Sequence, residues 1–462
     1  MSRTAAVVYA DDIAATAPAL GNDAVDDDGF ALASPTRVVP PPPMPKSPAA
    51  LVPVPPGMDW PLLATVMGLM TVGLVMSYSA SIFVALHQHA GDDTHFLTRH
   101  LAHLGVGLVA LFVGAHLPYQ AWRKLAYVFM VGCVLALVAV LLFGETRNRA
   151  TRWLLIAGVP LQPAEVAKFA FVVYLAHSLT KKISREVVGS FALGFLPHAF
   201  VWLVVFALCM KQPDLGTGVV LGVLLFTMTY VAGTNVSYLI LLVFGAFGSL
   251  VAFVIHDPMR SRRLVAFLEP LQYRDTTGFQ LFNGKLAVAT GGLFGNGLGL
   301  SRQKLGFVPE AHTDFVLSII AEELGLVGVA LVALGFLFML LRGLRIALRA
   351  HDEFGRLLAA GVTILIGTQA AVNFGVVMGT LPTKGLTLPF VSHGGSSLAA
   401  MGLAVGVLLN VGRGGNPDFA WPRLPGFGRE PDGTSPRNRR NRTHSSSSAS
   451  NAAADVAEEG AP

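Results

Sequence analysis

Residues 215–255, LGTGVVLGVLLFTMTYVAGTNVSYLILLVFGAFGSLVAFVI, decide the fold class because they form a run of 41 residues without a charged side chain. A helix needs about 20 mostly apolar residues to cross the hydrocarbon core of a bilayer. The run is therefore too long for one membrane-spanning helix and long enough for two. Gly233-Thr234-Asn235 in its middle is a turn signal, and we divide the run there into two spans.

Apolar runs of similar length occur on both sides of this segment. Eight further spans are predicted at 61–86, 101–117, 125–144, 164–180, 187–210, 314–341, 357–378 and 395–412. We expect Pro197 to kink the span at 187–210. The sequence thus predicts an all-α polytopic membrane protein of about ten transmembrane helices, with a large extracytoplasmic loop, 256–313, between helices 7 and 8.

The composition indicates the same class of protein. Hydrophobic residues make up 53% of the chain and charged residues 13%, and the mean hydropathy is +0.58. A soluble chain of this length needs more charge to cover its surface. The net charge is +5, but the basic residues lie in loops and in the C-terminal tail, so we expect lipid headgroups rather than nucleic acid as partners. Two scattered cysteines, Cys133 and Cys209, exclude a disulfide framework.

Both ends of the chain differ from the middle. Residues 1–57 combine acidic clusters with a proline-rich stretch, and residues from 413 onward are rich in Gly, Pro, Arg and Ser. Such compositions cannot bury a core. We therefore predict a disordered N-terminal tail at 1–57, a membrane domain at 58–412 and a disordered C-terminal tail at 413–462. An even number of spans places both tails on one side, and the arginines of the C-terminal tail place that side in the cytoplasm.

One predicted outside loop opposes this charge rule. Arg147, Arg149 and Arg152 lie between the third and fourth spans. An anionic ligand bound there would compensate for the excess positive charge. Alternatively, the three arginines pair with lipid phosphates.

Polar residues crowd against helix ends in four predicted outside segments. They comprise 151–153 with 162–168, then 211–217, then 291–304 with 309–315 and 321–325, and finally 381–397. In this order, and over the whole membrane domain, they resemble the SEDS family (shape, elongation, division and sporulation) of polytopic peptidoglycan glycosyltransferases. PTKGLTLP at 382–389 resembles the cell-division branch of the family more than the elongation branch. His393 departs from the family pattern, which usually has tyrosine there, and Asn283-Gly284-Lys285 replaces a more usual polar-serine pattern; both departures concern local substrate contacts.

The resemblance implies an enzyme of the inner membrane at the division septum, with its active site on the periplasmic face. Such an enzyme polymerises lipid II, a lipid-linked disaccharide-pentapeptide, into glycan strands. The sugar 4-hydroxyl of the acceptor attacks the anomeric carbon of the donor with inversion, and undecaprenyl pyrophosphate leaves. The implied partners are lipid II, the nascent glycan chain, a class B penicillin-binding protein transpeptidase and other divisome membrane proteins.

Asp314 is the predicted catalytic base, because the resemblance places the essential aspartate there. It lies at the start of the eighth span, where unpaired N–H groups and a partial positive charge should keep a carboxylate ionised. An ionised carboxylate can accept the hydroxyl proton. From the residues alone, the alternative is that Asp314 or Thr313 is an ordinary N-cap.

Two residues before Asp314 are assigned supporting roles. Glu310 would share a helical face with Asp314, and it either orders the loop or helps to hold a divalent cation such as Mg²⁺ or Mn²⁺ near the diphosphate. Two carboxylates alone are a weak metal signal, so the sequence leaves the need for a metal open. His312 is expected to support the site rather than to react.

Glu322 and Glu323 lie deeper, about 12–14 Å along the helix from Asp314. Ionisable groups at that depth face a cavity or a charged partner. We predict Lys168 as the partner of one of them, in a structural ion pair between the fourth and eighth spans. Direct participation in the chemistry is the alternative.

Cations from separate segments, namely Arg152, Lys211, Lys304 and Lys384, are predicted to converge around the departing diphosphate. Alternatively, each contacts a lipid headgroup. The glycines of 291–299 form either a phosphate cradle or a close-packed loop. Trp153 either stacks on a sugar or anchors the chain at the interface. The other predicted substrate-binding residues are Gln162, Glu165, Lys168, Gln212, Asp214, Ser301 and Ser392.

Two other functions fit parts of the pattern. A lipid II flippase would also have about ten spans, buried charges and Pro-interrupted helices. However, no pair of inverted repeats is evident, and the polar residues cluster on one predicted face. A non-catalytic divisome scaffold would use the two tails to recruit partners.

Overall fold

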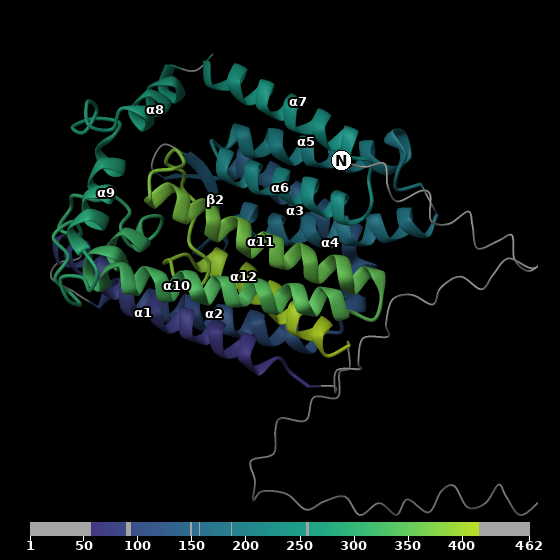
Figure 1. The fold of residues 1–462 in the computed structure, drawn as a ribbon, viewed down its shortest axis with the longest axis horizontal. Helices are drawn as coiled ribbons and strands as arrows, with labels where there is room; N and C mark the ends of the chain where they lie inside the picture. The colour runs from purple at the N-terminus through teal and green to yellow at the C-terminus, as the bar shows by residue number, and fades with distance from the viewer. Residues whose placement is uncertain are drawn as a thin grey trace, which may run out of the picture. The chain divides into compact units, whose positions relative to one another are not determined.

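The computed structural model describes residues 57–88, 94–147, 150–156, 158–185, 187–255 and 258–414. Apart from residues 57, 413 and 414, the two predicted tails lie outside these ranges. The described residues form a bundle of long helices (Figure 1). The helical membrane class predicted from the sequence is confirmed.

Ten helices correspond in position to the ten predicted spans. They are α1 (Trp60–Gln88), α2 (His95–His116), α3 (Tyr119–Phe143), α4 (Pro163–Ser184), α5 (Leu196–Lys211), α6 (Leu215–Val231), α7 (Val236–Ile255), α10 (Val316–Arg349), α11 (Glu353–Val377) and α12 (Gly395–Gly412). Among the described residues, seven helices are long and apolar enough to cross a membrane, and α4, α6 and α7 are not among them. The exact number of spans therefore stays a prediction.

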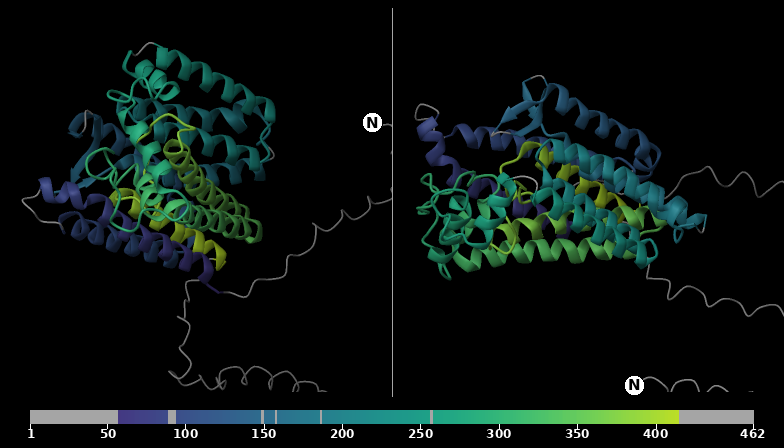
Figure 2. Two further views of the ribbon diagram at one scale, coloured as in Figure 1. Left: turned by 60° about the vertical axis from the view of Figure 1, so that its left-hand side comes forward. Right: turned by 90° about the horizontal axis from the view of Figure 1, so that it is seen from above.

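The predicted division of the long apolar run is present. α6 ends at Val231 and α7 begins at Val236. Gly233 between them has φ 92°, a left-handed conformation that glycine adopts readily because it has no Cβ. α7 lies at the edge of the bundle (Figures 1 and 2).

Pro197 lies inside the fifth span, close to a change from π-helix to α-helix, and the kink expected there stays a prediction. A π-helical turn, η1 (Phe191–Phe195), precedes α5, and Pro197 lies in the first turn of α5. The Leu196 N–H donates to the Phe191 carbonyl oxygen, so helical hydrogen bonding continues up to the residue before the proline. The Ser190 side chain accepts hydrogen bonds from the backbone N–H groups of Leu193 and Gly194 at the start of η1.

Two regions that the sequence analysis left as loops contain regular structure. The stretch between α3 and α4 forms a three-stranded antiparallel sheet of β1 (Glu145–Arg147), β2 (Ala150–Ile156) and β3 (Val159–Leu161), in the order β1-β2-β3. The predicted loop 256–313 contains α8 (Pro258–Leu268) and α9 (Phe279–Gly291), and α9 packs against α10.

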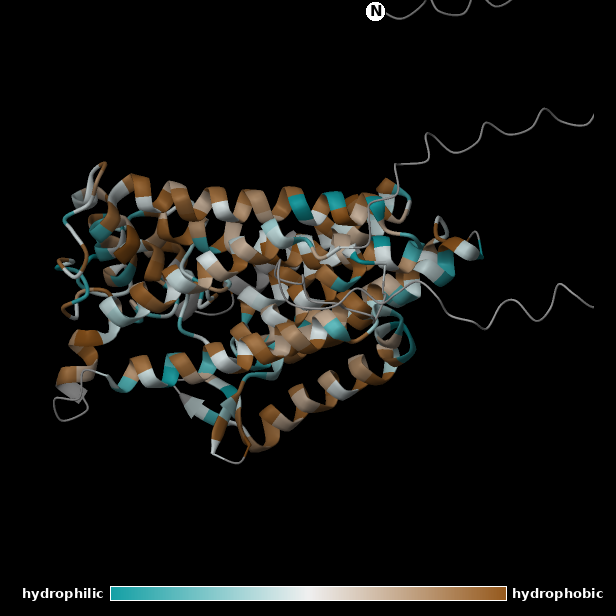
Figure 3. Ribbon diagram, turned by 90° about the horizontal axis from the view of Figure 1, so that it is seen from below, coloured by the Kyte–Doolittle hydropathy of each residue, from teal (hydrophilic) through white to brown (hydrophobic). Residues whose placement is uncertain are grey.

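Glycines allow α2 and α12 to pack closely. A Cβ added to Gly402 would lie 2.3 Å from the carbonyl oxygen of Gly107, and one added to Gly406 would lie 2.1 Å from that of Leu111. Small residues at such contacts are typical of helix pairs in membranes. The outer faces of the helices are largely apolar, and hydrophilic residues gather toward the helix ends (Figure 3).

Polar contacts tie the helices together at one end of the bundle. The Arg342 guanidinium, near the end of α10, lies 2.8 Å from the Asp59 carboxylate, just before α1. The Tyr119 hydroxyl at the start of α3 donates to Asp352 at 2.7 Å. The sheet and the loop before α10 lie at the opposite end, where the predicted site residues gather.

Candidate functional site

Asp314 lies two residues before α10, in a loop held by α11. Asn373 of α11 donates through Nδ2 to the carbonyl oxygen of Asp314 at 2.9 Å and to that of Leu386 at 2.8 Å. One buried amide thus joins the loop before α10 to the loop before α12. The N-cap position of α10 is Phe315, and no side chain caps it, so Asp314 is not an ordinary N-cap.

Arg152 of β2 lies beside Asp314. Its Nε donates to the Gln212 carbonyl oxygen at 3.0 Å, and its Nη2 donates to the Pro213 carbonyl oxygen. A Cβ added to Gly385 would lie 3.1 Å from Asp314 Oδ2 and 3.5 Å from Arg152 Nη1. Three segments distant in sequence therefore meet here. The guanidinium is oriented by protein carbonyls, which favours an internal role over pairing with lipid phosphates.

The charge environment of Asp314 differs from the prediction. Burial, and next the Glu310 carboxylate, raise the pKa of Asp314 to about 7, while Arg152 opposes the shift. Asp214 and Glu165 raise it further. The expectation that the helix N-terminus would hold Asp314 ionised was therefore wrong in direction, because desolvation and three nearby carboxylates outweigh the helix dipole. A carboxyl group with a pKa near 7 can gain or lose a proton at neutral pH.

The predicted pairing of Lys168 with Glu322 or Glu323 is wrong. Lys168 Nζ donates to Glu165 Oε1 at 2.7 Å and to Gln369 Oε1 at 3.0 Å. Gln369 Nε2 in turn donates to the carbonyl oxygen of Thr387 at 3.4 Å. This chain of buried groups joins α4 to α11 and to the loop that carries Gly385.

Glu323 pairs instead with Lys304. Lys304 Nζ lies 2.9 Å from Glu323 Oε1 and 3.0 Å from Ser79 Oγ, and Ser79 also donates to the Glu323 carboxylate. Glu322 accepts from the Ser301 hydroxyl and from the backbone N–H groups of Arg302 and Gln303. These contacts support the structural interpretation of both glutamates. Because Lys304 is paired with Glu323, its positive charge is neutralised inside the protein.

Lys304 is therefore not part of an open basic pocket, and the convergence of the other three predicted cations stays a prediction. Arg152 lies beside Asp314, Lys304 is paired with Glu323, and Lys211 is exposed at the end of α5. Lys384 is half-buried next to Gly385.

The glycine-rich segment packs against α10, as the close-packing interpretation predicts. A Cβ on Gly291 would lie 1.8 Å from the Ala321 carbonyl oxygen, and one on Gly295 would lie 2.1 Å from that of Glu323. The Asn296 N–H donates to the Glu322 carbonyl oxygen at 2.9 Å. Glycine is needed here because backbone contacts backbone.

Several other predicted residues hold the backbone around the site. Gln212 Nε2 donates to the Leu137 carbonyl oxygen at 2.9 Å. Asp214 is the N-cap of α6 and accepts from the Thr217 N–H and hydroxyl. The Gln162 N–H donates to Ser396 Oγ at 2.9 Å, and Ser392 Oγ accepts from the Leu388 N–H at 2.8 Å. Trp153 is half-buried on β2, and its contact with substrate stays a prediction.

A group of histidine rings surrounds His393 near the Asp314 loop. The ring centroids of His100, His103 and His312 lie 4.9, 5.2 and 5.7 Å from that of His393. Burial lowers the pKa of His393 to about 2 and also lowers the pKa of His312. His100 and His103 were not predicted as site residues, although their i, i+3 spacing in α2 places them on one helical face.

The described residues do not support a metal site made by protein ligands alone. Among them, no group of three or more His, Cys, Asp or Glu side chains is arranged to hold a metal ion. The carboxylates near Asp314 thus do not form a closed cation site.

The described residues thus form a polytopic helical bundle with a carboxyl group, Asp314, beside Arg152 at one end. Residues 60–416 match the family of cell cycle proteins that comprises FtsW, RodA and SpoVE. The chain belongs to this family, as the resemblance predicted.

Named relatives agree with this assignment. The probable peptidoglycan glycosyltransferase FtsW of Geobacter metallireducens is 43% identical over 355 residues, which cover 76% of this chain and 94% of that protein. The stage V sporulation protein E of Bacillus subtilis is 40% identical over 347 residues, which cover 75% and 94%.

Solved structures show the same fold. A structure described as the coordination of polymerization and crosslinking by a peptidoglycan synthase complex contains a chain that is 31% identical, with a TM-score of 0.63; the match covers 77% of this chain and 98% of that one. The rod shape determining protein RodA of Thermus thermophilus is 31% identical, with a TM-score of 0.56 and coverage of 77% and 96%.

Proposed function

We propose that this chain is a peptidoglycan glycosyltransferase that polymerises lipid II into glycan strands for the septal wall during cell division. Its membership of the FtsW, RodA and SpoVE family and its similarity to proteins named peptidoglycan glycosyltransferase FtsW support this function. The observation that carries the mechanism is Asp314, a carboxyl group with a pKa of about 7 beside Arg152.

Asp314 acts as the general base. As the 4-hydroxyl oxygen of the acceptor sugar forms a bond to the anomeric carbon of the donor, its proton passes to the Asp314 carboxylate. The bond between the anomeric carbon and the diphosphate oxygen breaks, and its electron pair leaves with undecaprenyl pyrophosphate. One displacement at the anomeric carbon inverts its configuration.

Arg152 supplies positive charge at the same point. Its guanidinium is held by the carbonyl oxygens of Gln212 and Pro213, so its orientation is set before substrate binds. It favours the ionised form of Asp314 and can also face the departing diphosphate. The remaining predicted substrate contacts are Trp153, Lys211, Glu310, His312 and Lys384.

The chain is a multi-pass membrane protein, and the finer points of its location are proposals. We place the Asp314 end on the periplasmic face, at the division septum. We also propose a class B penicillin-binding protein transpeptidase as partner, because a related chain is part of a peptidoglycan synthase complex. Other divisome membrane proteins would join this assembly.

The test uses the purified full chain, with the transpeptidase partner, and labelled lipid II. We expect glycan polymer from the native chain and none from Asp314→Ala. Asp275→Ala is the matched control, because Asp275 is an exposed carboxylate in the loop before α9, and its polymer yield should stay normal. Polymer from Asp314→Ala would refute the catalytic base. Translocation of lipid II across liposomes without polymer would identify a flippase, and neither activity would indicate a scaffold.

A further inference from the structure

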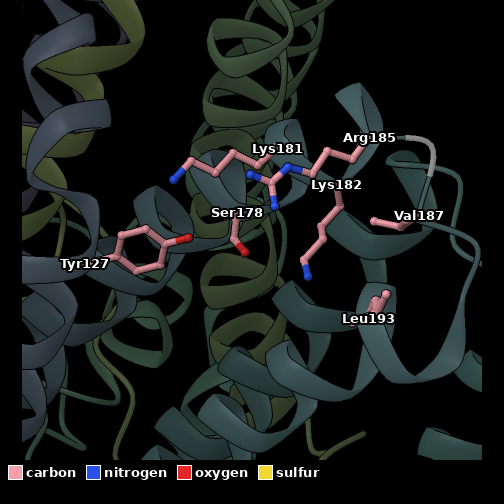
Figure 4. Close-up of a pocket in the computed structure, with 7 residues that line it drawn as sticks. All are labelled: Tyr127, Ser178, Lys181, Lys182, Arg185, Val187 and Leu193. Carbon is pink, nitrogen blue, oxygen red and sulfur yellow. The ribbon is translucent and has the colours of Figure 1, made fainter.

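A surface cavity of about 260 Å³ lies near the end of α4 that is far from Asp314 (Figure 4). Its lining comes from α3, from the last turns of α4, from the segment that follows α4 and from η1, and consists of Tyr127, Ser178, Lys181, Lys182, Arg185, Val187 and Leu193. Lys181 follows Glu165 by 16 residues of α4, about 24 Å along the helix. The cavity is therefore separate from the candidate active site.

Three cations line this cavity, and none of the described residues that line it is acidic. The guanidinium of Arg185, the amine of Lys182 and the hydroxyl of Tyr127 face the same space in Figure 4. Lys181 Nζ lies over the Tyr127 ring, 5.2 Å from its centroid. Within the described ranges, no carboxylate forms an ion pair with any of the three cations, and Glu186 lies outside those ranges. Cations gathered in this way favour an anionic ligand.

Hydrogen bonds hold the side chains that form one wall of the cavity. His198 Nδ1 lies 2.7 Å from the Gly194 carbonyl oxygen, which can only accept, so Nδ1 carries the proton. In the neutral ring, Nε2 then accepts from the Ser178 hydroxyl at 2.9 Å. Ser178 thus ties α4 to α5, and the three cations and Tyr127 supply the donors for a ligand.

Exposed apolar side chains continue from the cavity along the neighbouring helix. Leu193, which lines the cavity, is 58% exposed. Leu196 and Phe200 follow it at helical spacing on α5 and are 47% and 64% exposed. The helix dipole alone explains lysines in the last turn of α4, but it explains neither the cavity nor this apolar face. A ligand with an anionic head and an apolar tail matches both features.

We propose that this cavity binds the phosphate headgroup of an anionic phospholipid, with an acyl chain lying along the exposed apolar face of α5. Leu193 of the cavity lies at the start of the candidate span Phe191–Lys211, where a spanning helix meets the headgroup region. By the charge rule this end faces the cytoplasm, so the lipid belongs to the cytoplasmic leaflet.

The experiment counts phosphatidylglycerol molecules retained by the purified full chain, using native mass spectrometry from detergent with zwitterionic lipid in excess. We expect one tightly held molecule per chain. The double variant Lys182→Gln with Arg185→Gln should weaken its binding by roughly tenfold or more. The control is Arg345→Gln with Arg349→Gln, which removes the same charge from exposed positions on α10 and should retain the lipid.

A second variant tests the apolar half without changing charge. Leu193→Gln should weaken phosphatidylglycerol binding while leaving the three cations in place, so the proposal stays testable if the charge variants fold poorly. Equal loss in the α10 control would overturn the proposal, since surface charge would then suffice. Displacement by inorganic pyrophosphate at similar affinity, or tighter binding of a polyprenyl diphosphate than of phosphatidylglycerol, would also overturn it.

Discussion

The rate of glycan polymerisation is expected to rise with pH through the pKa of Asp314. Burial and the Glu310 carboxylate raise this pKa to about 7, and only the ionised form can accept the hydroxyl proton. A group with this pKa is about one tenth ionised at pH 6 and about nine tenths ionised at pH 8. The initial rate should therefore increase roughly tenfold over this range.

Two substitutions should move the midpoint of this profile in opposite directions. Glu310→Gln removes a negative charge that raises the pKa of Asp314, so the midpoint should fall and the relative rate at pH 6 should increase. Arg152→Gln removes the positive charge that lowers the pKa, so the midpoint should rise. The assay measures initial rates with labelled lipid II at constant ionic strength from about pH 5.5 to about pH 8.5.

Glu353→Gln provides the control, because Glu353 is an exposed carboxylate paired with Arg356 at the start of α11. Its profile should match that of the native chain. A flat profile across this range would show that Asp314 does not titrate in the rate-limiting step. A shift in the same direction for Glu310→Gln and Arg152→Gln would refute the electrostatic argument.

Three further predictions concern stability. The first two are measured by thermal unfolding of purified protein, and the third by the yield of folded protein together with its thermal unfolding. Asp314→Asn should stabilise the chain by up to about 4 kcal/mol at pH 8, because ionising a carboxyl whose pKa rises from 3.8 to about 7 on folding is unfavourable. The gain should disappear as the pH falls toward 4, where the native carboxyl is protonated, and an equal gain at both pH values would contradict it. Lys304→Met should cost about 3–5 kcal/mol by leaving the buried Glu323 carboxylate unpaired, and adding Glu323→Gln should recover part of this loss. Gly406→Leu should block the contact of α12 with α2 and lower the yield of folded protein, whereas Gly132→Ala, which meets no atom within 4 Å, should be neutral or stabilise by up to about 1 kcal/mol; equal yields would argue against close packing.

The positions of the long helices follow from the sequence alone. In a bilayer the backbone must satisfy its own hydrogen bonds, so long apolar runs become helices whatever packs around them. The turn at Gly233 was predicted for a similar local reason, since it needs only a residue tolerant of a positive φ. The polar segments also carried the family resemblance and, with it, the assignment of Asp314.

Hydropathy and residue propensity did not predict every local feature between the long helices. Pro197 marks the fifth span as irregular, but only the structure shows that a π-helical turn, η1, directly precedes α5 there. The sheet between α3 and α4 was missed because its strands are short and its pairing depends on neighbouring segments.

The partners of the buried charges were decided only by the tertiary structure. By residue type alone, either Lys168 or Lys304 could pair with Glu323. In the structure Lys168 on α4 contacts Gln369, and the glycine-rich loop brings Lys304 to Glu323. The pKa of Asp314 also reverses the expectation from its place before a helix, because carboxylates from other segments surround it. The positions of the helices depend on the hydropathy of consecutive residues, which the sequence gives directly. The ion pairs and pKa values of buried groups depend on which distant side chains the packed helices bring within a few ångströms.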